Sequence, residues 1–155
     1  MIQKLLQTDT DFIYLFLRVI AGLIIFPYGM QKLFGWFSDF GGGVGIRQIL
    51  LNMKSKKIPS VIAWLVIIGQ SFGSVALITG CFGRIAATVN FIIFTGALIN
   101  HAPDGWTMNW KGNKKEEGIE YFVMLLSLLL VVIIRGSGPI SIDAWILAIL
   151  GTKTG

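Results

Sequence analysis

Four long apolar blocks dominate the chain and limit what it can fold into. They cover residues 12–34, 61–80, 84–101 and, with polar flanks included, 117–136. A bilayer core needs about 20 residues of helix, whereas a transmembrane strand needs only about ten. Backbone groups in lipid must pair within the structure, so blocks of this length favour helices. The sequence predicts one all-α integral membrane domain over residues 1–155, a bundle of four transmembrane helices in a lipid bilayer.

The composition supports a membrane setting and excludes several classes of function. Only 14% of the residues are charged, whereas a soluble domain has about 25%. The net charge of +5 comes from cations spread over loops and termini, with one cluster at Lys54, Lys56 and Lys57. This is typical of membrane-flanking loops and not of nucleic-acid binding. One cysteine and one histidine exclude an intramolecular disulfide, a thiolate metal site and a bis-histidine haem, and no flavin or iron–sulfur motif is present.

Two short helices are expected outside the four blocks. In the first long connection, residues 46–53 carry apolar side chains at helical spacing, which predicts an interfacial helix. The glycines at 41–45 lack the Gly-Lys-Ser/Thr of a phosphate loop, so they predict a flexible turn. After the fourth block, Gly and Pro end the helix, and Ser141 or Asp143 can cap a short last helix. That C-terminal helix is expected to lie in the interface or against the bundle.

The distribution of lysine and arginine predicts the orientation. The side with both long loops carries seven cations and the other side carries four. The long-loop cations are Arg47, Lys54, Lys56, Lys57, Lys111, Lys114 and Lys115, and the others are Lys4, Arg84, Arg135 and Lys153. By the positive-inside rule, the long loops are expected in the cytoplasm and both termini outside.

A polar face runs along the first block. At about 100° per residue, Arg18, Gly22, Gly29 and Lys32 share one side of the helix. Charged side chains within the membrane usually face the bundle interior, so Arg18 and Lys32 are candidates for substrate binding. The alternative is that both side chains reach out to opposite membrane interfaces.

Small residues predict where the helices pack. Gly22 and Gly29 on the first block, and Gly69 and Gly73 on the second, let neighbouring helices approach closely. Gln70 lies beside this stripe, and we expect it to bridge helices by hydrogen bonds. A glutamine cannot act as an acid or a base.

The polar segment 101–121 is the candidate for chemistry. His101 shares a helical face with Asn90, and its imidazole can exchange protons or serve as a polar anchor. Glu117 and Glu120 lie one turn apart, where paired carboxylates can trade protons. The alternative is that both are ordinary acids at a helix N-terminus. Trp106 and Trp110 fit an aromatic belt.

These residues together resemble the DoxX-like family of small bacterial membrane proteins over nearly the whole chain. The matching pieces are Leu17-Arg18 with Gly22, residues 28–33, residues 80–87, His101, residues 108–110, residues 117–121, residues 136–138 and residues 141–143. The resemblance implies four transmembrane helices in the bacterial cytoplasmic (inner) membrane. It carries family positions over to Arg18, Lys32, Arg84, His101, Asn109, Glu117 and Glu120.

The resemblance also implies a redox setting. Relatives include the membrane subunit of a thiosulfate:quinone oxidoreductase, and others are associated with redox-defence complexes. Gln70 stands where many relatives have Glu, and Phe122 stands where many have His; both departures remove a titratable group.

We expect a subunit of a quinone- or sulfur-linked membrane redox system. In it, Arg18, Lys32 and Asn109 bind substrate, and His101, Glu117 and Glu120 handle protons. Quinone is the expected cofactor, and a redox partner subunit or a second copy is the expected partner. The alternatives are a non-enzymatic scaffold of a larger complex and a small-molecule carrier.

Overall fold

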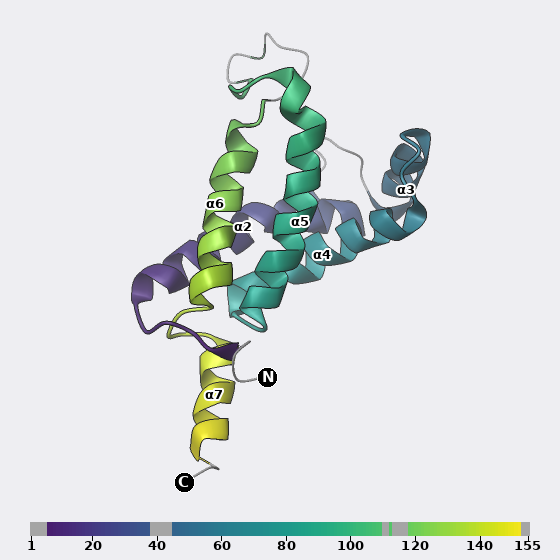
Figure 1. Ribbon diagram of the computed structural model, residues 1–155. Coiled ribbons are helices and arrows are strands. Elements are labelled where there is room, and N and C mark those ends of the chain that lie inside the picture. Colours follow the sequence, from purple (N-terminus) through teal and green to yellow (C-terminus); the bar gives the residue numbers. More distant parts are fainter. Residues whose placement is uncertain (1–5, 38–44, 110–111, 113–117, 153–155) are drawn as a thin grey trace.

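The described part of the protein is entirely helical. The structure, a computed structural model, describes residues 6–37, 45–109, 112 and 118–152, and contains no strand among them (Figure 1). Its elements are α2 (Phe12–Phe34), α3 (Gly45–Ser55), α4 (Ser60–Thr79), α5 (Gly83–His101), the 3-10 helix η2 (Ala102–Asp104), α6 (Glu120–Arg135) and α7 (Ile142–Thr152). These helices begin and end within a few residues of the ranges expected from the apolar blocks.

Three described helices are long and apolar enough to cross a membrane. They are Phe12–Phe34, Ser60–Thr79 and the continuous stretch Gly83–Asp104. The fourth block forms only the 16 residues of α6, which span about 24 Å at 1.5 Å per residue, less than the roughly 30 Å of a bilayer core. Its helix starts late because the Ile119 and Glu120 N–H groups donate to the carbonyls of Gly105 and Trp106. The chain before α6 therefore folds back onto the preceding connection.

The helices associate as two close pairs. α2 packs along α4, and α5 packs along α6. The two pairs contact each other where α4 meets α5 and where α2 meets α6. In Figure 1, α5 and α6 run side by side across the other two helices. The α2–α4 approach depends on Gly29, where an added Cβ would lie 2.5 Å from the Gln70 carbonyl oxygen. The Ser71 hydroxyl donates to the Gly29 carbonyl at 2.8 Å and fixes the same crossing.

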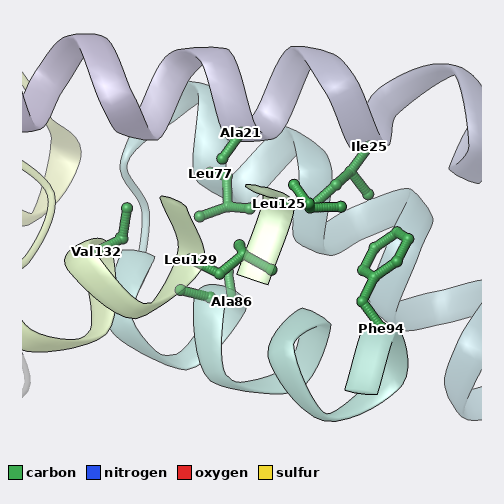
Figure 2. Close-up of a cluster of buried hydrophobic side chains, with 9 residues drawn as sticks. Ala21, Ile25, Leu77, Ala86, Phe94, Leu125, Leu129 and Val132 are labelled. Atoms are coloured by element: carbon green, nitrogen blue, oxygen red, sulfur yellow. The ribbon is translucent and has the colours of Figure 1, made fainter. Parts of the chain in front are cut away.

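The other glycines of the predicted stripe also lie at helix contacts. Gly22 faces Ile78 of α4, Gly69 faces Ile93 of α5, and Gly73 faces the Asn90 amide. Between these contacts, a buried apolar cluster fills the centre of the bundle. Figure 2 shows side chains of α2, α4, α5 and α6 converging there, including Ala21, Ile25, Leu77, Phe94, Leu125, Leu129 and Val132.

The up-and-down course of the chain gives the bundle two unlike ends. The capped end contains the start of α2, residues 80–84 and residues 136–143. The cavity end contains the end of α2, α3, the start of α4, the end of α5 and the start of α6. In Figure 1, α7 extends beyond the capped end, away from the four long helices. It is a short apolar helix of 11 residues.

Candidate functional site

An apolar cavity of about 650 Å³ lies at the cavity end. Its walls come from four helices and from α3, which contributes Met53, with Ile58 from the connection that follows α3. Three lining residues, Ile62, Leu65 and Ile92, are 47%, 58% and 66% exposed. Since this exposed surface is apolar and lies on the two membrane-length helices α4 and α5, the cavity opens toward lipid.

Lys32 brings a positive charge to this cavity. Its Nζ donates to the Tyr28 carbonyl at 3.3 Å and lies 5.7 Å from the centre of the Tyr28 ring. Tyr28 is one helical turn earlier and also lines the cavity, with Tyr121 of α6 beside it at a ring separation of 6.1 Å. No acidic residue lines the cavity, and no carboxylate of the described chain lies within ion-pair distance of Lys32. The ammonium group therefore keeps donor capacity for a ligand.

Gln70 supplies a second polar group to the same cavity. Its side chain is only 5% exposed, and its Oε1 atom has no hydrogen-bond partner among the described residues. A buried amide without a partner costs free energy, roughly 1–3 kcal/mol, unless something else satisfies it. A ligand hydroxyl or a water molecule in the cavity would do so. The sequence predicts that Gln70 bridges helices by hydrogen bonds, but its Oε1 atom makes none among the described residues; the residue lies at the α2–α4 contact and lines the cavity.

His101 lies next to the cavity but does not line it. Its ring stacks on Phe122, a lining residue, with 5.3 Å between ring centres. Its Nδ1 atom lies 2.9 Å from Asp104 Oδ2. A carboxylate in this position orients the imidazole and leaves Nε2 as the proton-exchanging atom. The ring of Phe122 separates that dyad from the cavity.

The remaining residues of segment 101–121 are placed differently. Glu120 Oε2 accepts a hydrogen bond from the Met108 backbone N–H at 3.3 Å, which ties the start of α6 to the connection before it. Asn109 is half-buried in that connection and is not a cavity residue. Glu117 and Trp110, both singled out from the sequence, lie outside the described residues.

Arg18 lies at the capped end, away from the cavity. It is 1% exposed, and its guanidinium donates to the carbonyls of Leu77 and Ile78 at 2.6 and 3.0 Å and to that of Ile140 at 2.9 Å. These are carbonyls at the end of α4 and in the connection before α7, so Arg18 caps one helix and holds the other segment. Fourteen residues of helix separate it from Lys32, about 21 Å along the axis. The two cations cannot contact the same small ligand.

Two further residues complete the capped end. Asp143 is buried, and its carboxylate accepts from the N–H groups of Phe82 and Gly83 at 2.6 and 2.9 Å and from the Ser137 hydroxyl at 2.6 Å. It thereby caps the start of α5 from another part of the chain. Arg84 Nη1 donates to the Ile133 carbonyl, near the end of α6, at 2.6 Å. Arg18, Arg84 and Asp143 therefore form hydrogen bonds with backbone groups at or near helix ends.

Sequence reasoning missed several residues of the cavity end. Asp104 could have been found from its position one turn after His101, and Tyr28 from its position one turn before Lys32. Met53 and Ile58 could not, because nothing local shows that the first connection folds over the cavity. Gln31 is also fully buried, and neither amide atom has a partner among the described residues; no pattern in the sequence singles it out.

The fold defines a helical integral membrane protein with several membrane-length helices. The chain belongs to the DoxX family, whose model matches residues 13–103, more than half of the sequence. The matched region runs from α2 through α5 and contains Arg18, Lys32, Gln70, Arg84 and His101, while Glu120 and α6 lie beyond it. No curated protein and no solved structure matches the chain.

Proposed function

We propose that this DoxX-family protein is the quinone-binding subunit of a membrane redox system. The observation that carries the proposal is a lipid-facing apolar cavity that holds an ammonium group without a carboxylate partner. A quinone has an aromatic head with two carbonyl acceptors and an apolar tail that remains in the bilayer. The cavity matches the head in polarity, and its exposed wall at Ile62, Leu65 and Ile92 gives the tail a path to lipid.

Lys32 and Gln70 are the proposed head-group contacts. The Lys32 ammonium donates to a quinone carbonyl. The Gln70 amide can donate to a carbonyl of the oxidised form and accept from a hydroxyl of the reduced form, so it suits both states. Reduction of a quinone to a quinol takes two electrons and two protons. The electrons come from a partner subunit or directly from a reduced substrate such as a sulfur oxyanion.

The proposed proton group is the His101–Asp104 dyad, with Glu117 and Glu120 as further acids of the same segment. His101 is the group proposed to give and take protons beside the cavity, where its ring stacks on Phe122 and its Nδ1 atom contacts Asp104. The carboxylate of Glu120 contributes to this segment mainly by holding Met108. Asn109 and Arg18 have no role at the head group in this proposal.

The proposed membrane arrangement follows from the helices. α6 crosses the bilayer as a fourth, short span together with residues 118–119 and 136–138, and α7 lies at the interface beyond the capped end. The long loops, and with them the cavity end, face the cytoplasm of a bacterial inner membrane, as the distribution of lysine and arginine favours.

Equilibrium binding of ubiquinone-1 to the full chain in neutral detergent tests the proposal. Lys32→Gln is expected to raise Kd about tenfold, since a hydrogen bond from a charged group is worth roughly 1.5–3 kcal/mol. Gln70→Leu is expected to raise it by roughly fivefold, corresponding to about 1 kcal/mol for a neutral hydrogen bond. Lys57→Gln, the same substitution at an exposed site outside the cavity, is the control and should change nothing. Absence of binding would favour a non-enzymatic accessory subunit instead.

A further inference from the structure

A second, smaller pocket lies between α3 and the start of α4. It has a volume of about 350 Å³ and is lined by Arg47, Leu50, Leu51, Lys54, Ser60 and Trp64. It shares no lining residue with the large cavity, to which α3 contributes Met53. The quinone proposal does not use it.

The charge of this pocket is one-sided. Arg47 and Lys54 are two turns apart on α3, and neither side chain has a hydrogen-bond or ion-pair partner within the described part of the chain. Residues 45–60 contain four cations and no acidic residue. Two exposed cations at one pocket, with no acid among its lining residues, attract an anionic group.

Apart from Ser60, the rest of the pocket is apolar. Leu51 and Trp64 are 53% and 43% exposed. Trp64 is one turn into the membrane-length helix α4, a depth at which tryptophan commonly marks the boundary between headgroups and hydrocarbon. α3 has cations on one face and leucines beside them, the pattern of a helix lying in the interface.

We propose that this pocket binds an anionic phospholipid. The phosphate lies between Arg47 and Lys54, the Ser60 hydroxyl donates to the headgroup, and an acyl chain runs along Leu51 and Trp64. A free anion would leave the apolar half of the pocket without a contact, whereas a phospholipid contacts both halves. The bound lipid also holds α3 in place at the edge of the large cavity. This proposal does not depend on which ligand the large cavity binds.

Native mass spectrometry of the full chain in neutral detergent tests it, with phosphatidylglycerol and phosphatidylcholine of identical acyl chains as probes. The protein is expected to retain phosphatidylglycerol and not phosphatidylcholine. The double variant R47Q/K54Q should bind phosphatidylglycerol about thirty-fold more weakly, since each cation near anionic lipid is worth about 1 kcal/mol and 1.4 kcal/mol is tenfold. Lys54→Gln alone should weaken it about fivefold.

The control is K56Q/K57Q, which removes the same charge from two neighbouring exposed lysines outside the pocket. It should change the affinity by less than about threefold. Equal losses in both double variants, or none in R47Q/K54Q, would overturn the site. Two results would contradict a phospholipid as the ligand. One is binding of inorganic phosphate with the same dependence on Arg47 and Lys54. The other is a dimer that forms without lipid and that the R47Q/K54Q substitutions dissociate.

Discussion

At the capped end, Arg18 is buried and donates to three backbone carbonyls, whereas at the cavity end Lys32 has one long hydrogen bond to a neighbouring carbonyl. Both are cations on the same face of the same helix, and the sequence alone treats them alike. The difference lies in what surrounds them. Helix ends and tight connections converge around Arg18 and use its donors, while a cavity faces Lys32. A charged side chain in a membrane helix therefore indicates a ligand site only where backbone groups do not already accept its hydrogen bonds.

The largest expected effect is at Asp143. Asp143→Ala removes the acceptor of one buried N–H group, one part-buried N–H group and one buried hydroxyl. The free energy of unfolding should therefore fall by about 4 kcal/mol, at roughly 1–3 kcal/mol for each unsatisfied group. Unfolding by sodium dodecyl sulfate in mixed micelles measures it. Asp11→Ala, at the exposed N-cap of α2, should cost only about 1 kcal/mol. Equal losses would mean that the capped end is not a buried network.

Arg18→Met should have the next largest effect. It leaves the carbonyls of Leu77, Ile78 and Ile140 without their charged donor, at a cost of about 3 kcal/mol in the same unfolding measurement. Arg135→Met is the matched control, because that arginine is exposed and its ion pair with Asp9 is 3.6 Å long. An exposed pair is worth less than about 1 kcal/mol. If Arg18→Met were as mild as its control, Arg18 would be available for a ligand.

The close crossing of α2 and α4 gives a third prediction. Gly29→Ala would place a methyl group 2.5 Å from a carbonyl oxygen and must push the helices apart, which should cost about 2 kcal/mol of stability. Gly96→Ala adds the same methyl where nothing lies within 4 Å. It should stabilise α5 by up to about 1 kcal/mol, the difference in helix propensity between alanine and glycine. Thermal unfolding of both variants in neutral detergent checks the opposite signs.

The smallest stability effect is expected at Lys32. Lys32→Gln removes one 3.3 Å hydrogen bond to a neighbouring carbonyl, so the free energy of unfolding should change by less than about 1 kcal/mol. The same unfolding measurement checks it. A loss as large as that of Arg18→Met would show that Lys32 is structural and would remove the contrast between the two ends.

Much of the fold was predictable because its signals are local. Runs of about 20 apolar residues define α2, α4 and α5, and Gly at the end of an apolar run marks where α2 and α4 stop. The apolar run of the fourth block, residues 119–134, is as short as α6, but we expected the helix to extend into the polar flanks. The point where α6 starts was not predictable, because it is set by hydrogen bonds to Gly105 and Trp106. Those pairings depend on how the connection folds back, which no local pattern encodes.

The candidate site was predictable only in part. Lys32 and His101 were singled out as site residues, whereas Gln70 was expected only to pack between helices. The structure brings Lys32 and Gln70 into one cavity with His101 beside it. Arg18 and Asp143 are also charged, but their hydrogen bonds go to helix ends that come from distant parts of the chain. Sequence shows which residues are charged and buried, while the partners that use them depend on tertiary packing.

The most direct test of the contrast is the affinity for ubiquinone-1 of two variants, measured side by side on folded protein in neutral detergent. Arg18→Lys keeps the charge at the capped end but has fewer donors in a different geometry, so it should lower stability and leave Kd within twofold of the wild type. Lys32→Gln should raise Kd about tenfold and leave stability nearly unchanged, as expected for a lost hydrogen bond from a charged group. The reverse result, in which Arg18→Lys weakens binding and Lys32→Gln does not, would contradict the assignment of ligand binding to the cavity end.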